Sequence, residues 1–265
     1  MIGQKHIQDI VKRYIESDTL PRTLLLEGEY GCGKHTLCRT IAEWLSMPLE
    51  DITSILTLET IERITLSATP KVYLIDSSKI SIKEQNIILK FLEEPLKNSY
   101  IIVICESKAM LLNTVVNRCL HLSFEQYSDE EKASFVKDGS KWTTEMFCYA
   151  NTPGRIIEFE NKPVSEMIEF AKKVLIQVRV ANYSNILTIP NKISFKEDSE
   201  LFDFSVFSYL LVECANTLYN TEVISYLIYE LTNEFYNNTK IPHINKQHLF
   251  EHFLIELKET YDRSK

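Results

Sequence analysis

The first 125 residues alternate between short apolar runs and segments in which apolar residues recur at helical spacing. Strand-like runs occupy 24–27, 72–75, 99–105 and 119–124, and helix-like segments occupy 36–45, 57–66 and 81–92. Continuous apolar runs of this length are typical of parallel strands that are buried on both faces. The alternation therefore predicts an α/β fold, with a parallel sheet covered by helices on both faces.

Beyond residue 128 the strand-like runs fade and long amphipathic segments replace them. Ser128 followed by three acidic residues predicts a helix start, and the turn at 151–154 predicts that Arg155 opens the next helix. Amphipathic helices are expected over 164–182, 200–218, 221–237 and 245–261. The apolar stripe of the first of these consists of Val164, Met167, Ile168, Ala171, Val174, Leu175 and Val178. The aromatic residues expected to pack in the core of the later helices are Phe202, Phe204, Phe207, Tyr209, Tyr219, Tyr226 and Tyr229.

Composition narrows the possible classes of protein. The apolar fraction of 45% in 265 residues is enough to build cores and excludes a disordered chain. The net charge of −8 argues against a free-standing nucleic-acid binder. Six cysteines form no Cys-x-x-Cys pair, so we expect no zinc site and mostly buried, reduced thiols in a cytoplasmic protein. No run approaches about 18 uncharged apolar residues, so no membrane span is expected.

The stretch "LLLEGEYGCGKHTL" at 24–37 is the main candidate for chemistry. Three of the chain's six glycines, Gly28, Gly31 and Gly33, fall within six residues, between a predicted strand and a predicted helix. Inward-facing backbone N–H groups, a helix N-terminus and Lys34 are typical of a loop that binds the phosphates of ATP. A glycine-rich turn that binds nothing is the alternative, and the sequence leaves open whether nucleotide still binds.

Residues needed for hydrolysis are missing around this loop. The usual residue after the lysine is a serine or threonine that ligates Mg²⁺, and here it is His35, whose imidazole prefers softer metals. Thr36 cannot simply replace it, because one helical step rotates a side chain by about 100°. The strand at 72–75 ends in Asp76, a candidate Mg²⁺ ligand, but Ser77 stands where a water-activating glutamate is expected. These changes predict a dead or very slow site with doubtful Mg²⁺ binding.

Two further residues beside the site allow alternative interpretations. Lys79 occupies a place where a second acid often stands. Cys32 could carry a lowered thiol pKa near the helix start, although an inert small residue is the commoner case.

Four strings resemble the AAA+ clamp-loader family, and within it most closely the delta-prime subunit of bacterial DNA polymerase III. They are "IGQKHI", "LPRTLLLEGEYGCGKHTL", "KVYLIDSSKISIKEQNIILKFLEEP" and "LLNTVVNRC", and the resemblance covers residues 2–124. It implies an AAA+ domain over 1–125, a small helical lid over 126–163 and an all-helical collar that oligomerises over 164–265.

The resemblance also implies roles for individual residues. The positions that match the family's nucleotide-binding residues are Ile2, Gln4, Gly28, Gly31, Gly33, Lys34, His35, Thr36, Asp76 and Arg155. In this group Ile2 and Gln4 match the base pocket, and Arg155 matches a lid arginine that senses the γ-phosphate. Arg118, in Asn117-Arg118-Cys119, matches an arginine finger that acts on nucleotide held by a neighbouring subunit, although the family typically has serine in place of Asn117.

The expected function is that of a clamp-loader subunit without ATPase activity of its own. It would act as a scaffold and supply Arg118 to a neighbour, with other clamp-loader subunits, the sliding clamp and primed DNA as partners. An active motor subunit of the same machine is the first alternative. A small phosphotransferase is the second; it predicts extra arginines in a mobile lid, and residues 125–160 contain only Arg155.

Overall fold

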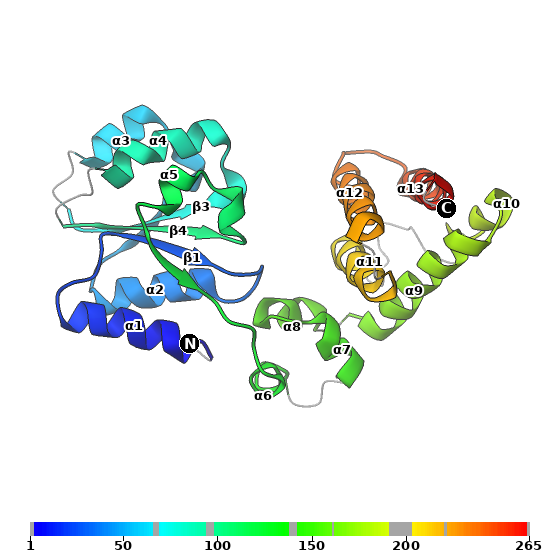
Figure 1. Cartoon of the computed structure of the whole chain (residues 1–265), viewed down its shortest axis with the longest axis horizontal. Coiled ribbons are helices and arrows are strands. Elements are labelled where there is room, and N and C mark those ends of the chain that lie inside the picture. The colour runs from blue at the N-terminus through cyan, green and yellow to red at the C-terminus, as the bar shows by residue number, and fades with distance from the viewer. Residues whose placement is uncertain are drawn as a thin grey trace. The chain divides into compact units, whose positions relative to one another are not determined.

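The computed structural model describes residues 3–65, 69–93, 98–137, 142–160, 162–190, 203–219 and 222–263 (Figure 1). The chain divides into two compact units: Met1–Asp138 with Asn151–Ile157, and Gly139–Ala150 with Glu158–Lys265. This division runs through the segment expected to form a lid, so the scheme of three domains stays a prediction.

A five-stranded sheet forms the centre of the first unit, in the order β2-β3-β4-β1-β5. Its strands are β1 Thr23–Glu27, β2 Leu49–Asp51, β3 Val72–Asp76, β4 Tyr100–Cys105 and β5 Leu120–Ser123. Every neighbouring pair is parallel, and Leu24, for example, lies opposite Ile102 on one side and Leu120 on the other. The carboxyl ends of all five strands therefore meet at one edge of the sheet.

Helices cover both faces of this sheet (Figure 1). One face carries α1 Lys5–Glu16 and α2 Lys34–Trp44, and the other carries α3 Leu58–Thr65, α4 Ile82–Glu93 and α5 Asn113–Val116. Leu24 and Leu26 belong to the first core and Leu25 to the second, and all three are fully buried. A strand between two cores needs an apolar residue at each position, which explains the continuous runs in the sequence.

The remaining elements of this unit are short. They are the 3₁₀ turns η1 Thr53–Ile55, η2 Ser77–Lys79 and η3 Lys108–Met110, and the helix α6 Asp129–Ala133. Ser128 caps α6 as predicted, and it forms a capping box in which Ser128 and Glu131 exchange hydrogen bonds.

The predicted α/β fold with a parallel sheet is confirmed, with some shifted boundaries. The helix after the glycine loop begins at Lys34 rather than residue 36, and α8 Pro153–Phe159 begins at Pro153 rather than Arg155. Proline suits a first helical position, because its fixed φ matches the helix and its missing N–H is not needed there. The sequence analysis did not predict α1, β2 or α5, and β2 is a three-residue edge strand too short and too charged to give a periodic pattern.

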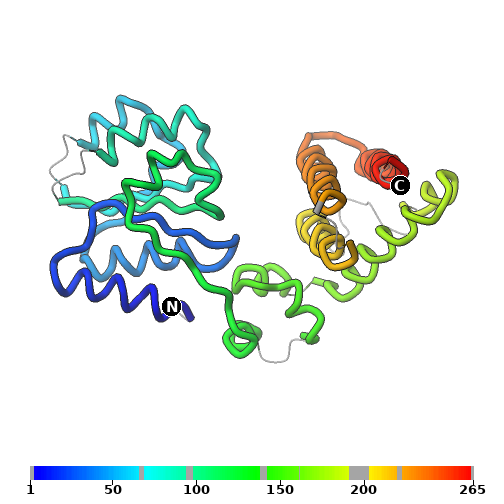
Figure 2. Tube along the Cα trace, viewed as in Figure 1, coloured from blue at the N-terminus to red at the C-terminus, as the bar shows by residue number. Residues whose placement is uncertain are grey.

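The second unit is helical. Its helices are α7 Thr144–Tyr149, α9 Val164–Val180, α10 Tyr183–Ile186, α11 Phe204–Leu218, α12 Glu222–Asn238 and α13 Lys246–Arg263. Helices α9 and α12 each pack against both α11 and α13 (Figure 2). All seven residues of the predicted stripe on α9 are buried, which confirms that prediction.

The predicted aromatic core is correct only in part. Phe207 is fully buried and its ring lies 5.8 Å from that of Phe250. Tyr226 and Tyr229 were predicted to be in the core but are 57% and 49% exposed, so that interpretation is wrong for them. A tyrosine tolerates the outer face of α12 because its hydroxyl can stay in contact with water or a polar group. The Tyr226 hydroxyl donates a hydrogen bond to Glu230 at 2.5 Å. Phe202 lies outside the described residues.

Most of the cysteines are buried, as expected: Cys32, Cys38, Cys105 and Cys214. Cys119 is half-buried and Cys148 is exposed. Within the described part of the chain, no helix combines the length and the apolar character needed to cross a membrane.

Candidate nucleotide site

The glycine loop joins β1 to α2 at the carboxyl edge of the sheet. Gly31 has φ +76° and Gly33, which precedes the first residue of α2, has φ +101°. Residues that carry a Cβ rarely adopt this left-handed backbone conformation, so glycine is favoured at both positions. A Cβ on Gly28 would lie 2.8 Å from both Cys32 Sγ and Phe124 Cβ, so space as well as conformation restricts the loop.

The turn that begins α8 lies directly against this loop. The Gly154 N–H donates to the Gly31 carbonyl at 2.9 Å, and the Thr152 hydroxyl donates to the Tyr30 carbonyl at 2.8 Å. The guanidinium of Arg155 lies over the Tyr30 ring, 4.7 Å from its centroid. The structure thus brings Arg155 next to the loop, although it is not one of the residues that line the cavity, and its role as a lid arginine stays a prediction.

Lys34 is bound to the loop that precedes it. Its ammonium donates to the carbonyls of Gly28 and, at 2.8 Å, Glu29, and the residue is only 8% exposed. A phosphate must compete with two carbonyl oxygens for this ammonium. The chemistry expected of Lys34 therefore depends on its third N–H donor or on a local rearrangement of the loop.

A cavity of about 620 Å³ opens beside the loop, within the range of small-molecule pockets. The sequence-predicted residues that line it are Gly31, Gly33, Lys34, His35, Thr36 and Asp76. Ser78, Lys79 and Glu106 contribute further polar side chains, and Tyr30, Tyr127 and Ile157 contribute apolar surface. The fold thus brings the two predicted halves of the site, the loop and the end of β3, to one cavity.

The carboxylate of Asp76 is engaged on both of its oxygens. Oδ1 accepts hydrogen bonds from the Ser78 N–H at 3.1 Å and the Ser78 hydroxyl at 2.7 Å. Oδ2 lies 3.1 Å from the Lys79 ammonium. Burial by itself would raise the pKa of Asp76, but the bonds from Ser78 and Lys79 outweigh it and hold the pKa below its usual range. Asp76 is thus a stable carboxylate that already has a cation beside it.

Ser77 replaces the expected glutamate in a confined place. The residue is 6% exposed, and its hydroxyl is buried without a hydrogen-bond partner. A carboxylate at this backbone position would begin from a buried site, where an unpartnered charge costs free energy.

The donor set fits a magnesium ion poorly. Mg²⁺ takes six oxygen ligands in near-ideal octahedral geometry. His35 offers a ring nitrogen where the family has a hydroxyl, and the oxygens of Asp76 are committed to Ser78 and Lys79. No group of three or more His, Cys, Asp or Glu side chains among the described residues could hold a metal ion.

The Cys32 thiol is not activated. Burial raises its pKa, and the nearby Lys34 charge only partly offsets this. The alternative of a lowered thiol pKa at the helix start is therefore wrong, and Cys32 is a small buried residue under the loop.

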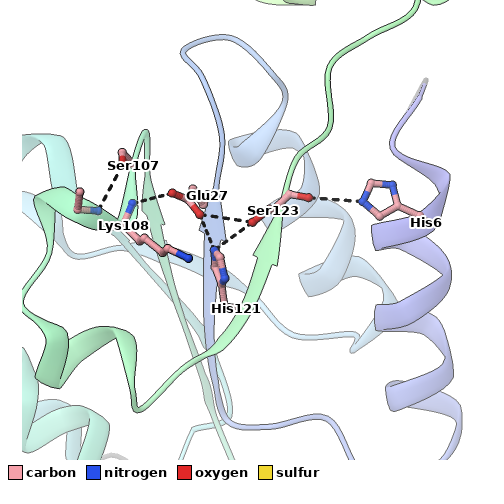
Figure 3. A network of polar contacts seen from close by, with 7 residues as sticks. His6, Glu27, Ser107, Lys108, His121 and Ser123 are labelled. Carbon is pink, nitrogen blue, oxygen red and sulfur yellow. Dashed lines mark hydrogen bonds and ion pairs between the residues drawn. The ribbon is translucent and has the colours of Figure 1, made fainter.

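A polar network at the base of the loop was missed by the sequence analysis (Figure 3). Glu27, the last residue of β1, accepts from the Lys108 N–H at 2.8 Å, and its other oxygen lies 2.6 Å from His121 Nε2. The Ser123 hydroxyl lies 3.1 Å from the same ring nitrogen, and His6 Nε2 lies 3.4 Å from the Ser123 carbonyl. The network ties the ends of β1 and β5 to η3 and α1. Residues so far apart in the chain leave no local pattern by which to predict it.

The structure does not show a base pocket at the two positions that the family resemblance assigns to one. Ile2 lies outside the described residues. The Gln4 side chain exchanges two hydrogen bonds with the backbone of Glu125, of 2.7 and 2.9 Å, and the residue is 5% exposed. Gln4 therefore holds the N-terminal segment against the chain that leaves β5.

Arg118 lies after α5 and is not one of the residues that line the cavity. Its guanidinium donates to Glu93 at 2.6 Å and to the Thr114 carbonyl at 2.8 Å, while its side chain stays 35% exposed. Ion pairs this exposed typically contribute at most about 1 kcal/mol, so the contact with Glu93 can be exchanged for another anion at little cost.

Several known proteins are similar to this chain in sequence. A family model described as "DNA polymerase III, delta subunit" matches residues 45–128, which include Asp76 and Arg118 but not the loop. Two curated relatives are DNA polymerase III subunit gamma from Buchnera aphidicola, subsp. Acyrthosiphon pisum and subsp. Schizaphis graminum. They are 26% and 28% identical over 171 aligned residues, and the matches cover 52% of this chain. The chain spans about half the length of these relatives, 47% in each case.

Solved structures share the fold. A DNA polymerase III gamma subunit-related protein from Thermotoga maritima aligns over 96% of this chain and 99% of its own, with a TM-score of 0.51 and 13% identity. The RuvB Holliday junction branch migration motor of the same organism aligns over 76% of this chain and 86% of its own, with a TM-score of 0.51 and 16% identity. Together with the parallel sheet and the phosphate-type loop, these define the chain as an AAA+ protein in fold. Within that class, the family model and the curated relatives support a member of the DNA polymerase III clamp-loader family.

Proposed function

We propose that this chain is a delta-prime-like clamp-loader subunit of DNA polymerase III that does not hydrolyse ATP itself. It holds neighbouring subunits in register through a helical collar over 164–265, with 126–163 as a lid. It supplies Arg118 to nucleotide on an adjacent motor subunit while the assembly loads a sliding clamp onto primed DNA in the cytoplasm.

The engagement of Asp76 carries this proposal. The carboxylate that would hold Mg²⁺ is occupied by Ser78 and Lys79, and Ser77 and His35 replace two further groups needed for hydrolysis. Arg118, in contrast, is at the surface with only a weak partner. A subunit that keeps its arginine and loses its own chemistry is suited to act on a neighbour's nucleotide.

An active motor subunit is the competing function, and the gamma subunits among the relatives and the retained Lys34 favour it. ATP turnover by the purified chain separates the two functions. We expect turnover at background, because the water-activating carboxylate is missing; turnover well above background establishes the motor function instead.

The arginine-finger role is tested with Arg118→Ala in a clamp loader reconstituted with an active motor subunit. We expect at least about a tenfold loss of ATP turnover at the interface served by Arg118, because a finger can contribute roughly 10³–10⁵ in rate. Steady-state ATPase assays of the reconstituted complex measure this, and the complex must first be shown to assemble.

Two control variants separate a finger from a structural ion pair. Arg63→Ala removes another exposed arginine of the same unit, on α3, and should leave turnover unchanged. Glu93→Gln breaks the ion pair but keeps Arg118, so it should also leave turnover unchanged. Full activity of Arg118→Ala, or an equal loss in Glu93→Gln, contradicts the finger role.

A further inference from the structure

The contact between Asp76 and Lys79 follows from local backbone geometry. Asp76 ends β3 and immediately precedes the 3₁₀ turn η2, of which Lys79 is the last residue. Residues three apart lie above one another in a 3₁₀ turn, so the lysine returns over the aspartate. The Lys79 ammonium consequently lies 3.1 Å from Asp76 Oδ2. The chain itself places a cation on the carboxylate that would otherwise receive a metal ion.

This ammonium also faces the cavity. Lys79 lines the cavity with Lys34, and its side chain is 63% exposed, whereas that of Asp76 is 11% exposed. An ammonium has three N–H donors, and one is directed at Asp76. The other two donors are available to an anion. Asp76 can therefore orient the Lys79 ammonium and still leave donors for a ligand.

The charges that line the cavity suit an anion that brings no metal. Lys34, Lys79, Asp76 and Glu106 all line it, and Lys79 pairs with Asp76. A Mg²⁺ ion bound to Asp76 would have to displace the Lys79 ammonium and find further oxygen ligands, and His35 supplies none. A nucleotide that enters without a metal meets a cation already in position.

We propose that the cavity binds nucleoside di- or triphosphates without Mg²⁺, with Lys79 held on Asp76 in place of the metal ion. The residues that make the cavity unsuitable for Mg²⁺ are thus the ones that would let it bind an anion without a metal. The proposal concerns the isolated chain and does not depend on clamp-loader assembly.

Calorimetric titration of the full chain with ADP and with ATP, in EDTA and in excess Mg²⁺, tests this. We expect the wild-type dissociation constant to be the same in both conditions within about threefold. Lys79→Met should weaken binding in EDTA by about tenfold or more, as loss of a charge-assisted hydrogen bond predicts. Lys83→Met is the matched control, because Lys83 is exposed on α4 and does not line the cavity, and it should change nothing.

Mn²⁺ gives a readout that a merely structural role of Lys79 would not change. By electron paramagnetic resonance, wild-type protein with ADP should show no more bound Mn²⁺ than ADP alone, whereas Lys79→Met should gain a protein-bound ion at Asp76. Asp76→Asn, which keeps the size of the side chain, should bind ADP in EDTA at least as tightly as wild type.

Three results overturn the proposal. They are wild-type binding that strengthens tenfold or more with Mg²⁺, unchanged binding by Lys79→Met in EDTA, and absence of ADP and ATP binding in both conditions. The second and third results would leave the proposed function and the role of Arg118 unaffected. The first would also weaken the argument from Asp76 for a silent site, and ATP turnover by the purified chain then tests the proposed function separately.

Discussion

At the scale of single residues, the glycines of the site act through space as well as through conformation. Gly31 and Gly154 are 123 positions apart in the numbering, yet a Cβ on Gly154 would lie 2.5 Å from the Gly31 Cα. The sequence indicated Gly31 as part of a phosphate loop but gave Gly154 only a role in a turn. A close approach between two backbone segments far apart in the chain is a tertiary contact, and no local sequence pattern predicts it.

Gly154→Ala tests this close approach. The added methyl group meets backbone rather than a flexible side chain, so the loop and the start of α8 must move apart. We expect the first unit to lose about 1–3 kcal/mol of unfolding free energy, the usual cost of overpacking. Urea unfolding followed by circular dichroism measures it. An unchanged midpoint would show that the two segments separate freely.

At the scale of elements, the sequence predicted most of the fold for a clear physical reason. Strands buried on both faces and helices with a wide apolar stripe leave strong patterns, as in β3, β4 and α9. The pattern gave wrong or missing predictions where tertiary packing determines whether a strand forms or a side chain is buried. Edge strand β2 is stabilised by pairing with β3, and the exposed tyrosines of α12 have the same spacing as core aromatics.

Some features of the candidate site could likewise be predicted from the sequence, and others depend on the three-dimensional structure. The loop and Asp76 could be predicted because each follows a strand end in the chain. The use of both Asp76 oxygens depends on the 3₁₀ geometry of η2, and the Glu27–His121 contact depends on strand order. These contacts become visible only in three dimensions.

The N-terminus of α11 offers a prediction that combines capping with charge. Asp203 accepts hydrogen bonds from the Ser205 and Val206 N–H groups at 2.8 and 3.2 Å and pairs with Lys162. Asp203→Ala should cost the second unit about 1 kcal/mol, the usual effect of losing an N-cap. Asp203→Asn keeps a capping oxygen and should cost less. Urea unfolding of the full chain at pH 7 measures both.

The effect of Asp203 should depend on pH. Burial by itself would raise the pKa of Asp203, but Lys162 and the capping N–H groups outweigh it, so the folded pKa lies below the ordinary 3.8. The unfolded chain therefore binds the proton first, and this stabilisation is present above pH 3.8 and is lost as pH falls through the folded pKa. The difference between wild type and Asp203→Asn should shrink over that range. A difference that stays constant down to pH 2 contradicts the charge contribution.

At the scale of the whole molecule, the residues that differ from a motor's motifs lie in more than one element. His35 is the second residue of α2, and Ser77 and Lys79 are the first and last residues of η2, so two separate elements depart from a working motor. Each change is compatible with the fold, because the sheet and both cores are complete without them. The proposed loss of hydrolysis is therefore compatible with an intact fold.

This distribution predicts the outcome of an attempt to restore the motor. His35→Thr with Ser77→Glu replaces the two missing groups, but Lys79 remains on Asp76 and the new glutamate enters a position that is 6% exposed. We expect this double variant to remain inactive and to be less stable than wild type. Adding Lys79→Ala frees Asp76 for Mg²⁺, so only the triple variant should gain turnover. ATPase assays belong in a reconstituted complex, where a neighbouring subunit can supply an arginine finger, with an inactivated partner motor to remove its background. Turnover by the double variant as high as that of an active triple variant would show that Lys79 does not block the metal position, and the inactive state would then rest on His35 and Ser77 alone.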